Sequence, residues 1–228
     1  MADALTLDVL DRPAGGALRA LHRLGRERVA GLRGIVRLRT LTFKASYAPN
    51  QTPRRIALIS VWQPGADVEA GWRTLLGDAA ARAREHWHVR GEVARYDGTD
   101  PLRGWWPDAA GAAPLADDEP VLVVISGDLR PGAVLPFVRD GVRAIGDAFG
   151  HPGYLGGLGL ISSPLNTTSC SAWRTYADAR DYAWREGGAH AGVVANDAAR
   201  DQHRTACFIR IRPLASSGTL NGRPVFSR

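Results

Sequence analysis

Residues 166–173 read NTTSCSAW and residues 205–212 read TACFIRIR, and a long helical pattern joins these two strand-like runs. The pattern carries His190 shortly after the pair Gly187–Gly188. Two glycines weaken a helix by about 2 kcal/mol relative to two alanines, which favours a kink or a close backbone approach at this point. We therefore expect this strand–helix–strand stretch to present His190 as the chemical centre, because a neutral imidazole is a common metal ligand.

The same order of elements is predicted to occur twice along the chain. Alternating apolar and polar residues predict strands, apolar residues at helical spacing predict helices, and glycine and proline mark the turns. Residues 108–118 have the composition of a linker between the two sets. The first set has strands at 4–10, 35–43, 55–62 and 89–96 with helices at 18–32 and 66–86, and the second has strands at 120–126, 154–161, 166–173 and 204–212 with a helix after the first and the third.

Short sequence matches place the two sets in register. Arg12-Pro13 matches Arg130-Pro131, Ser60-Val-Trp62 matches Ser171-Ala-Trp173, and both halves end in a Gly/Pro-rich tail. Matches in the same order predict a duplicated β-α-β-β-α-β unit.

The duplication predicts an α+β fold of two tandem ferredoxin-like units, residues 1–112 and 113–228. Each unit is expected to form a four-stranded antiparallel sheet with both helices on one face. The two sheets then face each other as a pseudo-dimer within one chain. We expect the ligand site in a barrel-like cavity between the sheets.

His190 has no counterpart in the first unit. His190 follows Trp173 by seventeen residues, and the residue that follows Trp62 by seventeen is Ala79. A histidine that the fold requires tends to appear in both copies, whereas a cofactor ligand is needed once. The alternative interpretation is a half-exposed histidine that follows a helix break and has no chemical role.

Composition and charge narrow the possible partners. Apolar residues are spread too thinly for a membrane span, since the longest clean run is 121–125. Cys170 and Cys207 are too few for a disulfide scaffold, and we expect a cytoplasmic protein. The net charge of +6 comes from dispersed arginines without a basic run, so we expect a solvated basic surface and no nucleic-acid partner.

Other candidate ligands are weaker. Cys170 lies mid-strand among small residues and is expected to pack in the core. His86 and His88 flank Trp87 at a predicted helix-to-strand junction, and no carboxylate or cysteine is clearly spaced to complete a metal site with them. His203 is expected to face solvent. The sequence contains no P-loop, GxSxG, HExxH or CxxC motif.

Several runs together resemble one known family. The C-terminal half has a strand that ends in Trp173, a helix with the run Gly188-Ala-His190, and a strand with the aromatic–Arg run 208–212. The other similar runs are 55–62, 87–96, 104–107, 128–131 and 159–162. In these runs the chain resembles the spheroidene monooxygenase-like proteins. That family belongs with the dimeric α/β-barrel proteins.

The resemblance implies a haem-binding oxygenase of carotenoid biosynthesis. Such an enzyme inserts oxygen near the end of a polyene, using dioxygen and a reduced ferredoxin-like donor. Carried onto this sequence, the resemblance implies His190 as the ligand of haem b iron. We expect Arg174, Arg185 and Arg210 to pair with the haem propionates and Trp173 to lie beside the cofactor. The expected catalytic residues are Thr168, Ser171 and Arg174.

The reaction stays open at this point. Residues 202–206 depart from a Trp-Phe-x-Glu-like run of the family, which leaves a carotenoid or another apolar or nitrogen-containing metabolite as the substrate. A second hypothesis is a haem-dependent dehydration or rearrangement of an N–O compound, as in aldoxime dehydratase-like barrels. A third is a cofactorless ligand-binding or monooxygenase barrel. Because the chain carries both sheets, either a monomer or a homodimer is compatible with it.

Overall fold

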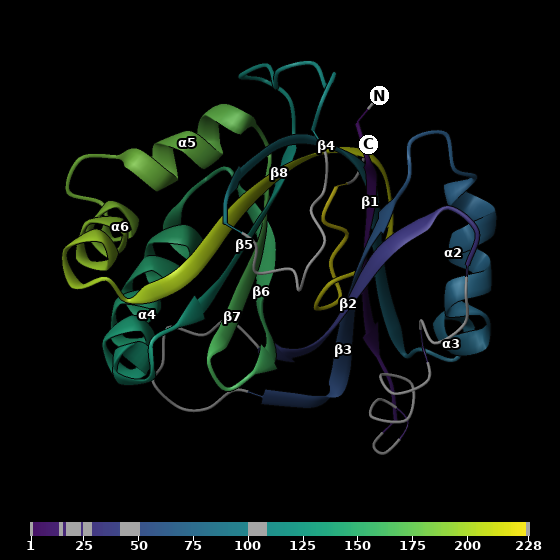
Figure 1. The fold of residues 1–228 in the computed structure, drawn as a ribbon, viewed down its shortest axis with the longest axis horizontal. Coiled ribbons are helices and arrows are strands. Elements are labelled where there is room, and N and C mark those ends of the chain that lie inside the picture. The colour runs from purple at the N-terminus through teal and green to yellow at the C-terminus, as the bar shows by residue number, and fades with distance from the viewer. Residues whose placement is uncertain are drawn as a thin grey trace.

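Strands form a closed barrel at the centre of the computed structural model, and helices cover it on two sides (Figure 1). The structure describes residues 2–13, 16, 24, 29–41, 51–99 and 109–226. The strands are β1 Ala4–Asp11, β2 Leu32–Leu41, β3 Gln51–Trp62, β4 Glu85–Gly98, β5 Val121–Leu129, β6 Tyr154–Ser163, β7 Asn166–Trp173 and β8 His203–Gly218. The helices are α2 Val68–Leu76, α3 Asp78–Ala81, η1 Pro131–Ala133, α4 Val134–Gly150, α5 Tyr176–Trp184 and α6 Ala189–Arg200.

The barrel consists of two sheets with the same internal strand order. The first runs β4-β1-β3-β2 and the second β8-β5-β7-β6, which is the order of a ferredoxin-like unit in each case. Antiparallel pairing of β4 with β8 and of β2 with β6 closes the barrel. The predicted α+β pseudo-dimer is therefore confirmed. The unit boundary at residues 112 and 113 stays a prediction.

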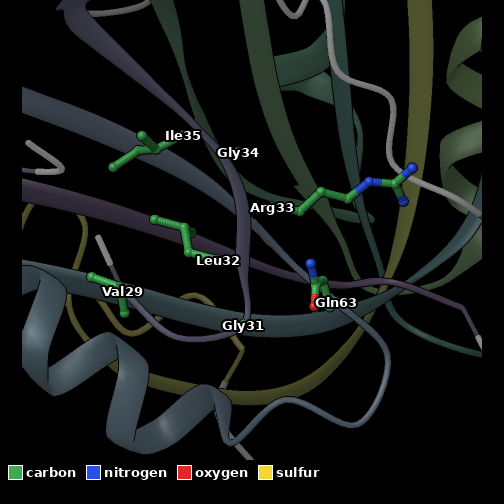
Figure 2. Close-up of a pocket in the computed structure, with 7 residues that line it drawn as sticks. All are labelled: Val29, Gly31, Leu32, Arg33, Gly34, Ile35 and Gln63. Carbon is green, nitrogen blue, oxygen red and sulfur yellow. The ribbon is translucent and has the colours of Figure 1, made fainter. Parts of the chain in front are cut away.

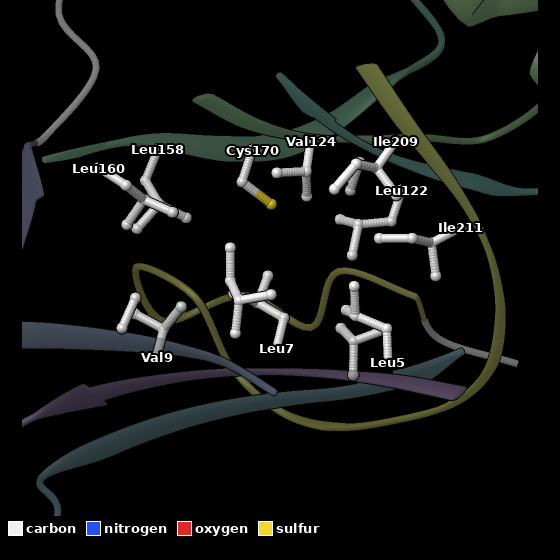
Figure 3. Close-up of a cluster of buried hydrophobic side chains, with 14 of the residues drawn as sticks. Leu5, Leu7, Val9, Leu122, Val124, Leu158, Leu160, Cys170, Ile209 and Ile211 are labelled. Carbon is white, nitrogen blue, oxygen red and sulfur yellow. The ribbon is translucent and has the colours of Figure 1, made fainter. Parts of the chain in front are cut away.

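Apolar side chains from both sheets meet inside the barrel. Leu5, Leu7 and Val9 of β1 face side chains of β5–β8, and their exposed fractions are at most 3% (Figure 3). Leu220 and Val225 of the C-terminal tail are buried in the same cluster. We expected a ligand cavity between the sheets, but the described residues place an apolar core there. The tail accounts for the difference, because it inserts between the sheets.

The helices divide into two groups that cover opposite sides of the barrel. Figure 1 shows α2 and α3 beside the first sheet and α4–α6 beside the second. The helix expected at 66–86 is shorter and interrupted at Gly77, so His86 and His88 both lie on β4. The helix expected at 18–32 falls largely outside the described residues. Among the helices of the described residues, none is long and apolar enough to cross a membrane.

Candidate functional site

His190 lies in the first turn of α6. The sequence predicted a single helix between β7 and β8, but the structure has two, α5 and α6. The chain turns between them at Gly187, which adopts the left-handed backbone conformation (φ 72°). Gly188 is the N-cap of α6. The backbone N–H of Ala189 donates to Asp147 Oδ2 of α4 at 2.7 Å. The glycine pair thus sets where α6 begins, and Asp147 fixes its N-terminus and the position of His190.

The imidazole of His190 is held in a form suited to bind a metal. Its Nδ1 lies 3.2 Å from the backbone carbonyl oxygen of Ala183, so Nδ1 carries the proton and donates it. Burial lowers the pKa of His190, although the bond to Ala183 opposes this shift. The ring is therefore neutral near pH 7, and Nε2 offers its lone pair. A haem-ligating histidine needs this tautomer.

A stack of aromatic rings connects His190 to the sheet. The ring centroids of His190 and Tyr182 are 4.9 Å apart, and those of Tyr182 and Trp173 are 4.7 Å apart. The Tyr182 hydroxyl donates to the carbonyl oxygen of Ala144 in α4. These contacts fix one side of the imidazole with rigid groups from α4, α5 and β7.

The helix layer over the second sheet is packed less tightly than the layer over the first. When Trp62 of β3 is aligned with Trp173 of β7, the buried Ile56 and Leu58 correspond to Thr167 and Ser169. Thr167, Ser169 and Ser171 are only half-buried, as are Val123 and Ile125 of β5. No residue of α6 is fully buried, whereas Ala79 of α3 packs closely on the first sheet. The second layer thus exposes polar and apolar surface to a ligand.

Alternation along β7 separates two of the predicted catalytic residues. Ser171 faces the helices, and its hydroxyl oxygen accepts from Trp173 Nε1 at 2.9 Å. Thr168 points into the barrel, where its hydroxyl is hydrogen-bonded to Ser126 at 2.8 Å. Residues an odd number apart on a strand face opposite sides, so Thr168 cannot line a pocket beside His190. Trp173 is buried in the helix layer, near His190 through Tyr182.

The structure does not bring the three predicted arginines together. Arg174 donates to the carbonyl oxygen of Pro152 at the end of β7. Arg210 is paired with Asp97 of β4. Arg185 lies in the turn before α6, where it is 3.8 Å from Asp181 and largely exposed. Only Arg185 belongs to the segment that leads directly into His190.

His203 is a second histidine in the same layer, and it is not exposed as expected. Its Nδ1 lies 2.7 Å from Asp197 Oδ1, and its side chain is 14% exposed. A Cβ added to Gly127 of β5 would lie 3.0 Å from Nε2 of this ring, so the ring packs against the strand. The edge of the ring also meets Phe137. Because Nε2 lies against Gly127, the strand covers the nitrogen that an iron ligand would use, which makes His203 a poorer iron ligand than His190.

A cluster that the sequence did not reveal lies on the outer face of the first sheet. His86 Nε2 and His88 Nδ1 lie 2.9 Å and 2.8 Å from the same oxygen, Oδ1 of Asp8 in β1. Burial by itself raises the pKa of Asp8, but hydrogen bonds from His86, His88 and Trp72 hold it below its usual value. The sequence showed no carboxylate spaced to join the two histidines, and in the structure Asp8 of the neighbouring strand β1 provides it.

A shallow, open pocket of about 460 Å³ lies at the start of β2. Figure 2 shows the side chains of Val29, Leu32 and Ile35 on one side and that of Arg33 pointing away from them. Among the described residues of this lining, Arg33 is the only charged one, and it pairs with Asp3 at 2.6 Å. The lining groups carry no convergent set for acid–base or metal chemistry, so we do not place the active site there.

Comparisons with known proteins bear on the fold alone. No family model matches the sequence, and no curated protein matches it. An aldoxime dehydratase (OxdRE) crystallised with butyraldoxime aligns with a TM-score of 0.55 and 10% identity, over 93% of this chain and 79% of that one. A second aldoxime dehydratase structure aligns with a TM-score of 0.52 and 11% identity, over 93% and 81%.

A candidate monooxygenase from Fusobacterium nucleatum subsp. nucleatum aligns over 100% of this chain and 98% of that one. Its TM-score is 0.44 and its identity 8%, which is too loose to carry a structural argument. The aldoxime dehydratase alignments agree with the tandem ferredoxin-like barrel described above. The chain shares this fold, and its chemistry must be argued from its own residues.

Proposed function

We propose that the chain is a haem-dependent enzyme in which His190 is the proximal ligand of haem b iron. The observation that carries the proposal is the geometry of this imidazole, which is fixed through the bond from Nδ1 to Ala183 and has no hydrogen-bond partner on Nε2 among the described residues. In the helix layer over the second sheet, the outer faces of β5 and β7 are only half-buried, which supports the proposal because a flat macrocycle would cover them. This layer replaces the barrel interior as the expected ligand site.

Each neighbouring group has a defined role in this proposal. Asp147 and Ala183 orient His190, and Tyr182 restrains its ring. Arg185 would pair with a propionate, with Arg174 and Arg210 as the further candidates. The Ser171 hydroxyl accepts from Trp173 and keeps its own proton for a substrate oxygen or nitrogen. When bound, haem supplies an iron centre that activates dioxygen or binds an N–O compound.

The first candidate reaction is monooxygenation of an apolar substrate such as a carotenoid. One atom of dioxygen enters the substrate, and the other leaves as water with two electrons and two protons. A ferredoxin-like protein is the proposed donor of these electrons, and the proposed location is the cytoplasm. The second candidate is dehydration of an aldoxime to a nitrile, which releases water and needs no net electrons. The likeness of fold to two aldoxime dehydratase structures supports this second candidate.

Haem reconstitution tests the cofactor assignment. Haem is titrated into the full chain and into His190→Ala and His203→Ala, and the Soret band is followed. We expect stoichiometric binding in the unmodified chain and in His203→Ala, and a lost or shifted band in His190→Ala. A colourless unmodified chain, or an unchanged band in His190→Ala, would refute the proposal.

Dependence on reductant separates the two reactions. The reconstituted chain is supplied with a linear carotenoid or with butyraldoxime, with and without dioxygen and a reduced ferredoxin. Oxygenated carotenoid that forms only with both additions supports monooxygenation. Nitrile that forms without a net supply of electrons supports dehydration.

A further inference from the structure

The acidic side chain at the centre of β1 is fully buried. Asp8 lies between Leu7 and Val9, whose side chains point into the barrel, so its carboxylate points to the outer face beneath α2. Its exposed fraction is 0%. An isolated buried carboxylate is costly, and such groups are normally paired or bound to a metal.

Strand register brings two histidines to this carboxylate. Asp8 is directly opposite His88 in the antiparallel β1–β4 pair, and His86 is opposite Leu10 two positions away. Both histidines face the same side of the sheet because they are two residues apart on β4. Their Nε2 and Nδ1 atoms and the Asp8 carboxylate oxygen all lie within 4.8 Å of one another.

Asp8 shares its hydrogen bonds unevenly between its two oxygens. Three groups converge on Oδ1: His86 Nε2 at 2.9 Å, His88 Nδ1 at 2.8 Å and Trp72 Nε1 at 2.9 Å. Oδ2 is buried and has no hydrogen-bond partner among the described residues. A carboxylate has two acceptor oxygens, so Oδ2 of Asp8 is a buried acceptor whose lone pairs are unused. A cation among the three side chains would use the orphaned oxygen and, with the imidazole protons on the other ring nitrogens, the lone pairs of His86 Nε2 and His88 Nδ1.

We propose that Asp8, His86 and His88 bind a first-row divalent metal ion of the Zn²⁺ class. Two imidazole nitrogens and a carboxylate oxygen form a donor set that such ions prefer over Mg²⁺ or Ca²⁺. Ligand atoms 2.8–2.9 Å apart need to separate by only a few tenths of an ångström to surround an ion at about 2.0–2.1 Å. Three protein ligands leave a fourth position for water or a small anion.

Trp72 of α2 completes the surroundings of the site. Its ring lies parallel to His86 within 9° and 4.6 Å from His88, and its N–H donates to Asp8. An outer-shell donor of this kind orients a carboxylate ligand. The side chain of His86 is 20% exposed, against 10% for His88. The ion therefore has its access on the His86 side. This site is separate from His190, which lies on the other unit.

Calorimetric titration of Zn²⁺ into the chelator-treated full chain tests the proposal. We expect one ion per chain, and at least about 100-fold weaker binding in Asp8→Asn, His86→Gln and His88→Gln. Trp72→Phe should weaken binding about 10-fold to 100-fold, because it removes an outer-shell partner. His203→Gln is the matched control, since it breaks a His–Asp pair elsewhere at 2.7 Å and should leave affinity unchanged.

Two outcomes would overturn the proposal: no binding of Zn²⁺ by the unmodified chain, or a full equivalent of bound ion in the three ligand variants. If Asp8→Asn or His88→Gln does not fold, His86→Gln decides alone, because His86 is the most exposed of the three ligands. Zn²⁺ should bind His190→Ala with the affinity of the unmodified chain, because the proposed metal site does not depend on haem.

Discussion

Arg212 of β8 fastens the connector between the units to the barrel. Its guanidinium donates to Glu119 at 3.1 Å and 3.2 Å and to Glu92 of β4 at 2.9 Å. It also donates to the carbonyl oxygens of Ala113 and Pro114 at 3.0 Å. The hydrogen bond from Arg212, with one from the backbone of Ala116, lowers the pKa of Glu119 from 4.5. One side chain thus joins the connector, β4 and β8.

Glu119→Gln should change how stability depends on pH. A carboxyl whose folded pKa is depressed contributes stability above its unfolded value, and this contribution is lost as pH falls through the folded value. We therefore expect the unfolding free energy of the unmodified chain to fall below about pH 4.5 more steeply than that of Glu119→Gln. Denaturant titrations across the acidic range measure the difference. Parallel curves for the two proteins would contradict it.

Single residues could be predicted where a short stretch of sequence marks them, and not where their role depends on contacts between distant strands. His190 could be chosen as a candidate because it stands beside two glycines and has no counterpart in the first repeat. Asp8 could not be assigned to His86 and His88, because the three meet only through the β1–β4 register. Thr168 and Ser171 were predicted together although they face opposite sides of β7, because the phase of a strand relative to its core is hard to read where its residues are small and polar.

At the level of elements, the break between α5 and α6 determines where His190 lies. Helical periodicity continues across 174–200, so the sequence predicted one helix with a weak point. The structure instead has two helices, and each begins at a side-chain oxygen. Thr175 Oγ1 accepts from the N–H of Asp178 in α5, and Asp147 accepts from Ala189 in α6. The second of these contacts spans 42 residues and was not visible in the sequence.

Asp147→Ala and Thr175→Ala should show that the start of α6 positions His190 and that the start of α5 does not. Each removes an acceptor from a helix N-terminus, and we expect each to cost about 0.5–2 kcal/mol of unfolding free energy. Only Asp147→Ala frees the turn that carries His190, so only that variant should also bind haem more weakly. Chemical denaturation and haem titration are the two measurements. Equal haem affinity in the two variants would show that the start of α6 does not position the ligand.

On the scale of the whole molecule, duplication was the most reliable signal. The order of elements and the short matches predicted two ferredoxin-like sheets, and the strand order confirms them. What occupies the barrel was not predictable, because the tail residues Leu220 and Val225 carry no periodicity that marks them as core. The unequal packing of the two helix layers was also hidden, since it depends on how far the folded helices bury the outer faces of β5 and β7.

Leu220→Ala tests whether the tail stabilises the barrel. Leu220 is 4% exposed within the core, so its truncation should cost about 2–5 kcal/mol. Leu214 of β8 is 49% exposed, and Leu214→Ala should change stability by no more than about 0.5 kcal/mol. Denaturant unfolding of both variants gives the comparison. Similar small losses in both would mean that the tail is not part of the core.

Coordination of iron by the His190 imidazole is tested most directly by chemical rescue. In His190→Gly the side chain is removed and a space of imidazole size remains beside Tyr182. We predict that His190→Gly binds haem weakly with an altered Soret band, and that added imidazole restores the band of the unmodified chain. The same treatment of His203→Gly should have no effect. A His190→Gly protein with the unmodified spectrum before imidazole is added would contradict the central claim.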